Sequence, residues 1–385
     1  MKISALGLGL ACATLTGVAA SAQEKTHTID RLVAHVSTVP AIAGKPIDLF
    51  VREKAPESIV NSADGKAPAG KVVLMVHGGY SPATLAFDVP YKNYSWMEYL
   101  AQRGYDVFAM DMTGYGRSGH PMMDDPCNLD PKQQDLLVPK NLPAKCDPKY
   151  PFELVNSDSE SDDIDRVVDF IRKLRGVDKI ALIGWSGGGI RTGSFLGRHP
   201  EKVDKYVIFA SSNYDRKNPS ERPAVLPKPG APMTIQTRDV GIDKRWLGTS
   251  KFPQTIEPGM PEMIWAMNAQ HDPLGATWGT GGLRAPTRTY WGWNAEGAAK
   301  VTVPTLIMVG EQDDLTRSNN QLFDDLGAKQ KAFIGIAQAT HFMVWEKQSR
   351  VLHAASYEWL QTTTVKGQLN GRFRADENGD IAAVK

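Results

Sequence analysis

Short apolar runs alternate with amphipathic stretches along much of the chain. Three such runs, at 71–76, 105–110 and 180–183, are typical of fully buried strands. Between the second and third runs, apolar residues recur at helical spacing over 162–175, and Gly176 ends the pattern. Strands that alternate with helices over short links predict a parallel sheet covered on both faces. The expected fold class is therefore α/β, with a mostly parallel, doubly wound sheet.

Further strands are expected on both sides of this central pattern. Residues 28–37 and 47–54 have the composition of strands and are expected to form an antiparallel pair. Later in the chain, the apolar runs at 203–210, 301–309 and 331–336 predict three more strands of the sheet.

The alternation of strands and helices is interrupted twice. Residues 120–157 are rich in Pro, Asp and Lys and are expected to form a surface excursion that contains Cys127 and Cys146. Residues 213–299 are rich in proline and glycine and are expected to form a cap inserted into the core. A disulfide between the two cysteines would close a loop of about 19 residues.

The N-terminal segment is typical of a bacterial export signal. One lysine precedes an apolar run that ends in small residues, so we expect residues 1–22 to be removed by cleavage near Ala22. The protein would then be periplasmic or secreted, where a disulfide is stable. The core would comprise residues 23–212 and 300–362, followed by a polar, loosely held tail over 363–385.

The balance of charged residues limits the kinds of binding partner that we expect. The chain has 44 basic and 43 acidic residues and no basic cluster, which argues against nucleic acid and anionic membranes as partners. No second long apolar span follows the export signal, so membrane insertion is not expected.

The candidate chemistry begins at Gly184-Trp185-Ser186-Gly187-Gly188, directly after a predicted buried strand. A serine hydroxyl is a weak nucleophile until a base can reach it. A tight turn from strand to helix exposes the hydroxyl, and glycines on either side remove the clashes that such a turn causes. Ser186 is therefore the candidate nucleophile.

A serine nucleophile needs a base and an orienting carboxylate. His341 follows the last predicted sheet strand of the core, at the sheet edge where the serine turn is also expected, and is the candidate base. Asp313 follows the strand at 301–309 and is the preferred acid; Asp314 and Asp215 remain alternatives.

The developing oxyanion needs two preorganised donors. One is expected to be the N–H group of Gly187. The other is expected from His77-Gly78-Gly79-Tyr80, where glycines allow close backbone approach, with Gly79 preferred and Tyr80 second.

Six of the nine tryptophans stand in the predicted cap or in the serine turn. Trp185 precedes the serine, and the cap holds five more: Trp246, Trp265, Trp278, Trp291 and Trp293. All six are candidate substrate-binding residues, and the five in the cap are expected to form an apolar or aromatic pocket roof. Alternatively, a small cap needs large side chains to form its own core.

These motifs, in this order, resemble the α/β-hydrolase superfamily, in its branch of serine esterases and lipases with an inserted cap. The resemblance rests on His77-Gly78-Gly79, Asp111-x-x-Gly114-Tyr115-Gly116-Arg117-Ser118, Gly184-Trp185-Ser186-Gly187-Gly188, Gly310-x-x-Asp313 and His341. It implies a structural role for residues 111–118, a cap at about 213–300, and no cofactor. No metal site is expected either. Serine at the turn departs from the dehalogenase and epoxide hydrolase branches, which have aspartate there.

The sequence thus predicts an exported serine esterase that acts through an acyl-enzyme on a small-molecule or oligomeric ester with an apolar or aromatic part. The same three residues could instead cleave a lactone, an amide or a β-diketone C–C bond. A non-catalytic binding protein on the same fold is the alternative outside enzymes.

Overall fold

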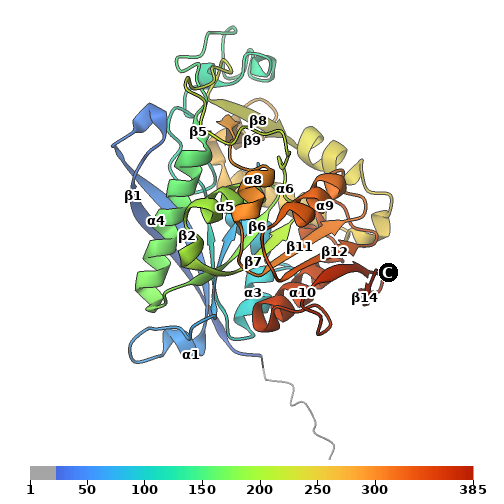
Figure 1. Cartoon of the computed structure of the whole chain (residues 1–385). Helices are drawn as coiled ribbons and strands as arrows, with labels where there is room; N and C mark the ends of the chain where they lie inside the picture. The colour runs from blue at the N-terminus through green and yellow to red at the C-terminus, as the bar shows by residue number, and fades with distance from the viewer. Residues whose placement is uncertain (1–22, 385) are drawn as a thin grey trace, which may run out of the picture.

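A ten-stranded sheet dominates the part of the chain, residues 23–384, that the computed structural model describes (Figure 1). Its strands are β1 (Thr26–Val36), β2 (Pro46–Pro56), β3 (Val72–Val76), β4 (Asp106–Met110), β6 (Ile180–Trp185), β7 (Val203–Phe209), β11 (Thr305–Gly310), β12 (Lys331–Ile336), β13 (Gly371–Ala375) and β14 (Ile381–Ala383). The spatial order is β1-β2-β4-β3-β6-β7-β11-β12-β13-β14. The predicted export signal at 1–22 lies outside the described residues.

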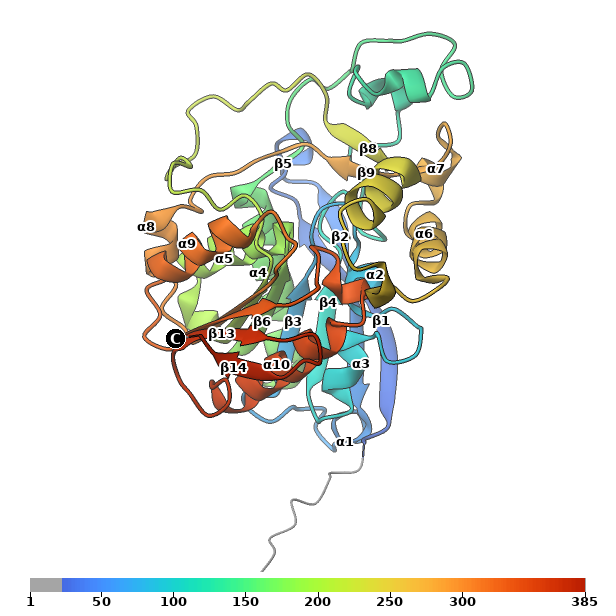
Figure 2. The ribbon, with the colours of Figure 1, turned by 90° about the vertical axis from the view of Figure 1, so that its right-hand side faces the viewer.

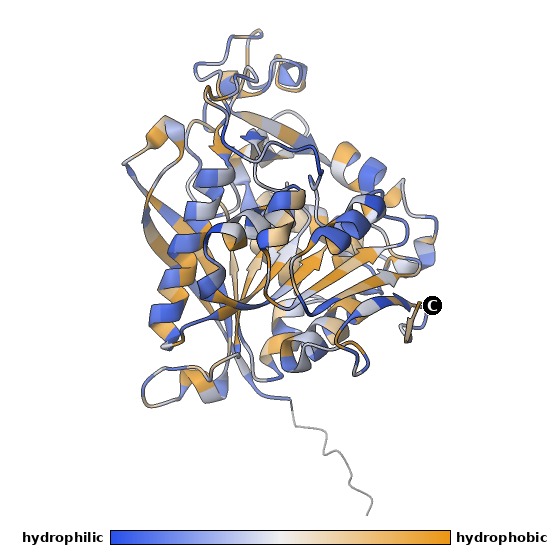
Figure 3. Ribbon diagram, in the orientation of Figure 1, coloured by the Kyte–Doolittle hydropathy of each residue, from blue (hydrophilic) through white to orange (hydrophobic). Residues whose placement is uncertain are grey.

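Strand directions confirm the predicted fold class. Every neighbouring pair from β4 to β13 is parallel. Antiparallel pairs occur only at the two ends of this described sheet, and one of them is the predicted pair of β1 with β2. The central strands β3, β4, β6 and β11 are buried at every position, which explains why they read as continuous apolar runs (Figure 3).

Helices cover both faces of the sheet. In chain order the α-helices are α1 (Glu57–Val60), α2 (Ala83–Phe87), α3 (Trp96–Ala101), α4 (Ser157–Arg175), α5 (Gly187–Arg198), α6 (Met260–His271), α7 (Pro273–Thr277), α8 (Ala295–Lys300), α9 (Thr316–Asp325) and α10 (Ser349–Thr362). Figure 2 shows α4, α5, α8 and α9 on one side of the sheet and α3, which contacts α10, on the other. None of the described helices is both long enough and apolar enough to cross a bilayer.

Helix α4 begins five residues earlier than the apolar pattern predicts. The Asn156 side chain accepts a hydrogen bond from the Ser159 N–H, and the Ser159 hydroxyl accepts one from the Asn156 N–H. This capping box stabilises a polar first turn that carries no apolar signal. The predicted end is confirmed, since Gly176 adopts the left-handed conformation, with φ of 63°.

The expected cap contains a hairpin of β8 (Met233–Thr237) and β9 (Gly282–Pro286), with α6 and α7 between them (Figure 2). Before α6 the chain also forms a π-helical segment, Asp239–Leu247. After β9, the short strand β10 (Arg288–Thr289) pairs with β5 (Val155–Asn156) of the excursion. The cap and the excursion therefore touch, although the sequence suggested two separate insertions.

A second hydrophobic core joins the two insertions. Leu129 and Leu137 of the excursion are fully buried there, together with Met233 and Trp278 of the cap. The C-terminal end of the expected cap packs elsewhere: its helix α8 lies on α5 of the main domain and not on this second core. Short 3₁₀ turns complete the described elements: Pro40–Ile42, Pro126–Asn128, Gln134–Leu136, Pro200–Lys202, Pro253–Thr255 and Met343–Trp345.

The C-terminal segment corrects an expectation. Residues 363–385 were expected to form a loosely held tail, but β13 and β14 extend the sheet. Phe373 and Ala375 alternate with arginines and are buried. The alternation is too short to stand out from a polar segment, so the strand becomes evident only from its pairing with β12.

The predicted disulfide between Cys127 and Cys146 is present. It closes the excursion beside the second core. Replacing both cysteines by serine is expected to lower the free energy of unfolding by about 3 kcal/mol, because the unfolded loop regains its freedom. Urea unfolding of the two proteins measures this difference. Equal free energies of unfolding for the two proteins would contradict the expectation. As a control, added reductant should not change the free energy of unfolding of the double variant.

His353 of α10 supplies a pH-dependent contribution to stability. Burial lowers its pKa to about 3, and the ring stacks on Trp96. Below about pH 6.5 the unfolded chain binds a proton at His353 that the folded chain does not. The free energy of unfolding therefore decreases as the pH is lowered, by up to about 1.4 kcal/mol per pH unit. His353→Phe should remove this contribution. Urea unfolding between about pH 5 and 7.5 tests it: equal pH slopes in both proteins would rule it out.

Candidate active site

Ser186 lies on the turn from β6 into α5, with φ of 54° and ψ of −118°. This conformation is unfavourable for a residue with a side chain and persists only where the surroundings enforce it. The surroundings here are crowded: a Cβ on Gly188 would lie 2.0 Å from the carbonyl oxygen of Val76. Glycine at 188 therefore allows α5 to approach β3 closely enough to form the turn.

The structure brings the three residues of the proposed triad together. His341 Nε2 lies 2.9 Å from Ser186 Oγ, and His341 Nδ1 lies 2.8 Å from Asp313 Oδ2. The Asp313 side chain is fully buried and that of His341 is 12% exposed. Of the alternative acids, Asp314 is exposed, and Asp215 is exposed and accepts a hydrogen bond from the Lys217 N–H.

A buried carboxylate holds the loop that carries His341. Glu346 accepts hydrogen bonds from the Thr340 N–H (3.0 Å) and the Thr340 hydroxyl (2.5 Å). Trp246 of the cap donates its indole N–H to the same carboxylate at 3.0 Å. Burial raises the pKa of Glu346. Sequence reasoning did not find this residue, because its only signal is a carboxylate close after the histidine.

The predicted oxyanion turn lies beside the serine turn. The Gly79 nitrogen is 3.5 Å from the position that a Cβ on Gly187 would occupy, so the two expected donors come from adjacent backbone segments. The side chain of Tyr80, the second candidate, is anchored in the cap through a 2.6 Å hydrogen bond to the Thr234 hydroxyl. These contacts are compatible with either Gly79 or Tyr80 as the second donor.

Buried polar groups fix the back of this turn. Arg191 of α5 donates to the carbonyl oxygens of His77 (2.7 Å) and Gly78 (3.2 Å) and forms an ion pair with Glu160. The His77 ring lies 2.6 Å from the Gly78 oxygen and accepts from the Met112 N–H. Burial, with a contribution from Arg191, lowers the pKa of His77 well below its usual value, so the ring is neutral and structural.

The cavity in front of Ser186 is polar and contains two cations. Among the twelve described residues that line it, two are arginines, Arg245 and Arg288, and none is acidic. Trp185 and Phe342 contribute aromatic surface near His341. This lining differs from the apolar roof that the tryptophan-rich cap suggested.

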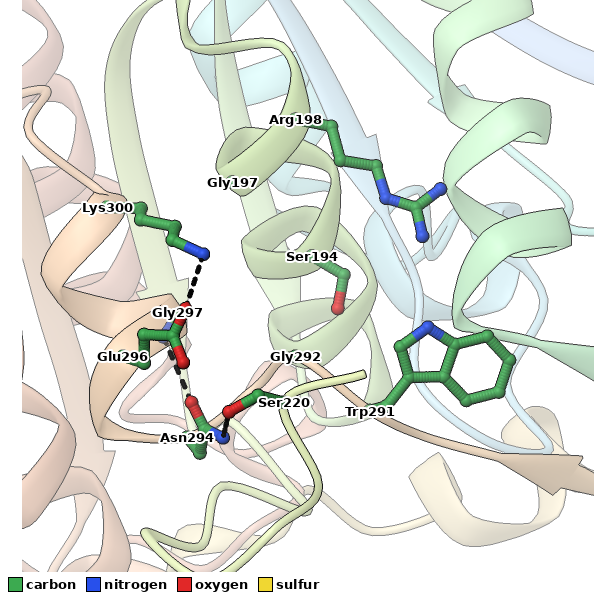
Figure 4. A pocket seen from close by; sticks show the side chains of 10 residues that line it. All are labelled: Ser194, Gly197, Arg198, Ser220, Trp291, Gly292, Asn294, Glu296, Gly297 and Lys300. Atoms are coloured by element: carbon green, nitrogen blue, oxygen red, sulfur yellow. Dashed lines mark hydrogen bonds and ion pairs between the residues drawn. The ribbon is translucent and has the colours of Figure 1, made fainter. Parts of the chain in front are cut away.

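Five of the six candidate tryptophans lie outside the lining of this cavity; Trp185 is the exception. Trp246, Trp278 and Trp293 are buried in the hydrophobic cores, and Trp265 packs against one of them. Trp291 lines a different cavity, between α5 and α8 (Figure 4). The interpretation of the cap tryptophans as a pocket roof is thus replaced by the alternative, a structural role.

No group of three or more His, Cys, Asp or Glu side chains is arranged to hold a metal ion within residues 23–384. Residues 111–118 have the structural role that the resemblance implied. Asp111 is buried, and its carboxylate accepts from the N–H groups of Ala83 and Arg117. Burial raises its pKa to about 6.

Comparison with known proteins agrees with this architecture. A family model described as "alpha/beta hydrolase fold" matches residues 71–348. Bromoperoxidase from Bacillus anthracis has a similar structure, with a TM-score of 0.50 and 13% identity over 86% of this chain and 100% of that one. At this identity the likeness concerns the fold alone. No curated protein matches the sequence.

Two esterases are also among the similar solved structures. The thermophilic esterase from Thermogutta terrifontis has a TM-score of 0.48 and 15% identity over 87% of this chain and 100% of its own. The esterase from Exiguobacterium antarcticum has a TM-score of 0.49 and 15% identity over 86% of this chain and 99% of its own.

The Glu346 contacts generate a prediction about the histidine loop. Glu346→Gln replaces one acceptor oxygen by a donor, so Thr340 or Trp246 loses a buried partner. We expect the free energy of unfolding to fall by about 1–3 kcal/mol and kcat on a simple ester to fall with it. Glu311→Gln, which removes an exposed ion pair with Arg374, is the matched control and should change stability by less than about 1 kcal/mol. Indistinguishable unfolding curves for the two variants would contradict the role of Glu346.

Proposed function

The chain belongs to the alpha/beta hydrolase fold family, and from this premise we propose that it is a serine hydrolase of carboxylic esters. The observation that carries the proposal is the pair of contacts at His341, 2.9 Å to the Ser186 hydroxyl and 2.8 Å to the Asp313 carboxylate. A hydroxyl, an imidazole and a buried carboxylate in this order form the arrangement that activates serine for acyl transfer.

In the proposed mechanism, Ser186 Oγ attacks the ester carbonyl while His341 Nε2 takes the hydroxyl proton. Asp313 accepts the Nδ1–H group and stabilises the imidazolium. The N–H group of Gly187 and that of Gly79 or Tyr80 donate to the oxyanion. His341 then protonates the departing alcohol, and a water molecule that it activates releases the acid from Ser186.

The same steps apply to other acyl compounds, so a lactone, an amide or a β-diketone remains an alternative substrate. Esters are favoured because the alcohol is a good leaving group once His341 protonates it, and no further group is required. An apolar or aromatic part of the substrate could contact Trp185 and Phe342, which line the cavity. Rates on p-nitrophenyl esters, set against lactones and diketones, separate these classes.

We also propose that the protein works outside the cytoplasm. The export signal expected at residues 1–22 and the disulfide between Cys127 and Cys146 support this, because disulfides persist in oxidising compartments. The mature N-terminus of the exported protein, determined by mass spectrometry, should follow Ala22.

A fluorophosphonate probe tests the proposed nucleophile. The protein should be labelled on Ser186, and Ser186→Ala should abolish labelling and reduce ester turnover by about 10⁴-fold or more. Ser194→Ala is the matched control, since Ser194 lies on the same helix but lines the separate cavity of Figure 4; its labelling should be unchanged.

Two results of this experiment would contradict the proposal. Undiminished labelling of Ser186→Ala would place the nucleophile elsewhere. A folded wild-type protein that neither reacts with the probe nor hydrolyses any ester would favour the non-catalytic binding protein.

A further inference from the structure

Arg288 is the feature of the site that the proposed ester hydrolysis leaves unexplained. It lies on β10, whose backbone is fixed by pairing with β5. Its Nη2 atom is 3.1 Å from the position that a Cβ on Gly79 would occupy, and Nη1 is 3.5 Å from the corresponding position on Gly187. The guanidinium therefore lies next to both backbone segments that are expected to bind the oxyanion.

The other arginines in the interior of the described chain show what a buried guanidinium requires. Arg175, Arg191 and Arg284 are each at most 5% exposed, and each forms an ion pair with a buried carboxylate. Such pairing is expected, because an unpaired buried charge is costly.

Arg288 is partly buried, yet within residues 23–384 no carboxylate lies within ion-pair distance of it. The one hydrogen bond of its side chain to another described residue runs from Nη1 to the Tyr115 hydroxyl at 3.0 Å, and its guanidinium lies 5.5 Å from the centre of the Tyr290 ring. Glu160, the carboxylate behind the turn, is already paired with Arg191. The remaining N–H groups of Arg288 are thus available to a negative charge supplied from the cavity.

The surroundings indicate where that charge would lie. Arg245 lines the same cavity, where its guanidinium lies 5.6 Å from the centre of the Phe342 ring, and it forms no ion pair with a described residue. Arg288 also lines a second cavity, and Asp215 is among the residues that line it. A ligand anion is repelled by Asp215 and attracted by both arginines, so it should lie on the Ser186 side of the guanidinium.

We propose that Arg288 binds a carboxylate on the acyl part of the substrate, so that the enzyme prefers half-esters of short dicarboxylic acids. This inference rests on the proposed ester hydrolysis. A carboxylate matches the planar fork of one guanidinium. The acyl part is indicated because Arg288 adjoins the residues assigned to the carbonyl oxygen, whereas the leaving alcohol must lie at His341.

Two esters of nearly the same shape test the proposal in the unmodified protein. Monoethyl succinate carries a carboxylate where ethyl levulinate has an uncharged methyl ketone. At about pH 7.5, where the carboxylate is ionised, kcat/KM should be roughly 10- to 100-fold higher for monoethyl succinate, the scale of one charge-assisted hydrogen bond. Release of acid is followed by titration at constant pH. Equal values for the two esters would overturn the proposal.

Variants then assign the preference to Arg288. Arg288→Met should remove the preference by lowering kcat/KM for monoethyl succinate while leaving kcat/KM for ethyl levulinate unchanged. Arg288→Lys should retain part of the preference. Arg374→Met removes the same charge from an exposed site paired with Glu311 and is the matched control. If Arg288→Met lowered kcat/KM equally for both esters, Arg288 would act on the oxyanion or on folding, and the proposal would be wrong.

A binding measurement separates this proposal from ester hydrolysis itself. The Ser186→Ala protein, which cannot turn over, should bind monoethyl succinate more tightly than ethyl levulinate in titration calorimetry, and Arg288→Met should abolish the difference. If the wild-type protein were not labelled by the fluorophosphonate probe but the binding preference were present, only the proposed hydrolase activity would be refuted. Labelling without the preference would refute only the role of Arg288.

Discussion

The whole site depends on one close contact between the backbones of α5 and β3. A Cβ on Gly188 would lie 2.0 Å from the Val76 oxygen, so this packing is open only to glycine. The contact holds Ser186 in a conformation that costs about 1–3 kcal/mol. Because β3 continues directly into the turn at 77–80, the same contact also sets the distance between the proposed nucleophile and the proposed oxyanion donors. A shift of α5 would displace both together.

Two buried carboxylates hold the rest of the site against this fixed contact. Glu160 of α4 positions Arg191, which binds the carbonyl oxygens of the oxyanion turn. Glu346 binds the loop of His341 and receives the indole N–H of Trp246 from the cap. Burying a carboxylate is costly. Three hydrogen bonds offset that cost at Glu346, and the buried ion pair with Arg191 offsets it at Glu160. The residues of the proposed site are therefore oriented by α4 and by the cap as well as by the strands that precede them.

Sequence alone could predict the features that depend on local pattern. Fully buried strands read as apolar runs, and in a parallel sheet the residues that follow such strands meet at one edge, which is enough to assemble Ser186, Asp313 and His341. What could not be predicted depends on distant partners. Trp246 is structural because its N–H group meets Glu346, a hundred residues away, and β13 is a strand because β12 pairs with it. Neither the hydrogen bond of Trp246 nor the pairing of β13 can be recognised from the residues next to it in the sequence.

The same distinction changes the interpretation of the two insertions. The sequence marks 120–157 and 213–299 as separate, yet they share a hydrophobic core, and their strands β5 and β10 pair. The disulfide closes the first insertion beside that core, and β10 brings the second back over the serine turn at Arg288. The insertions thus form one scaffold. The cap tryptophans build that scaffold and its contacts with the main domain. The side chains that the cap presents to the cavity are instead Asn213 and two guanidinium groups, those of Arg245 and Arg288, and this lining is the reason why we propose selection by charge.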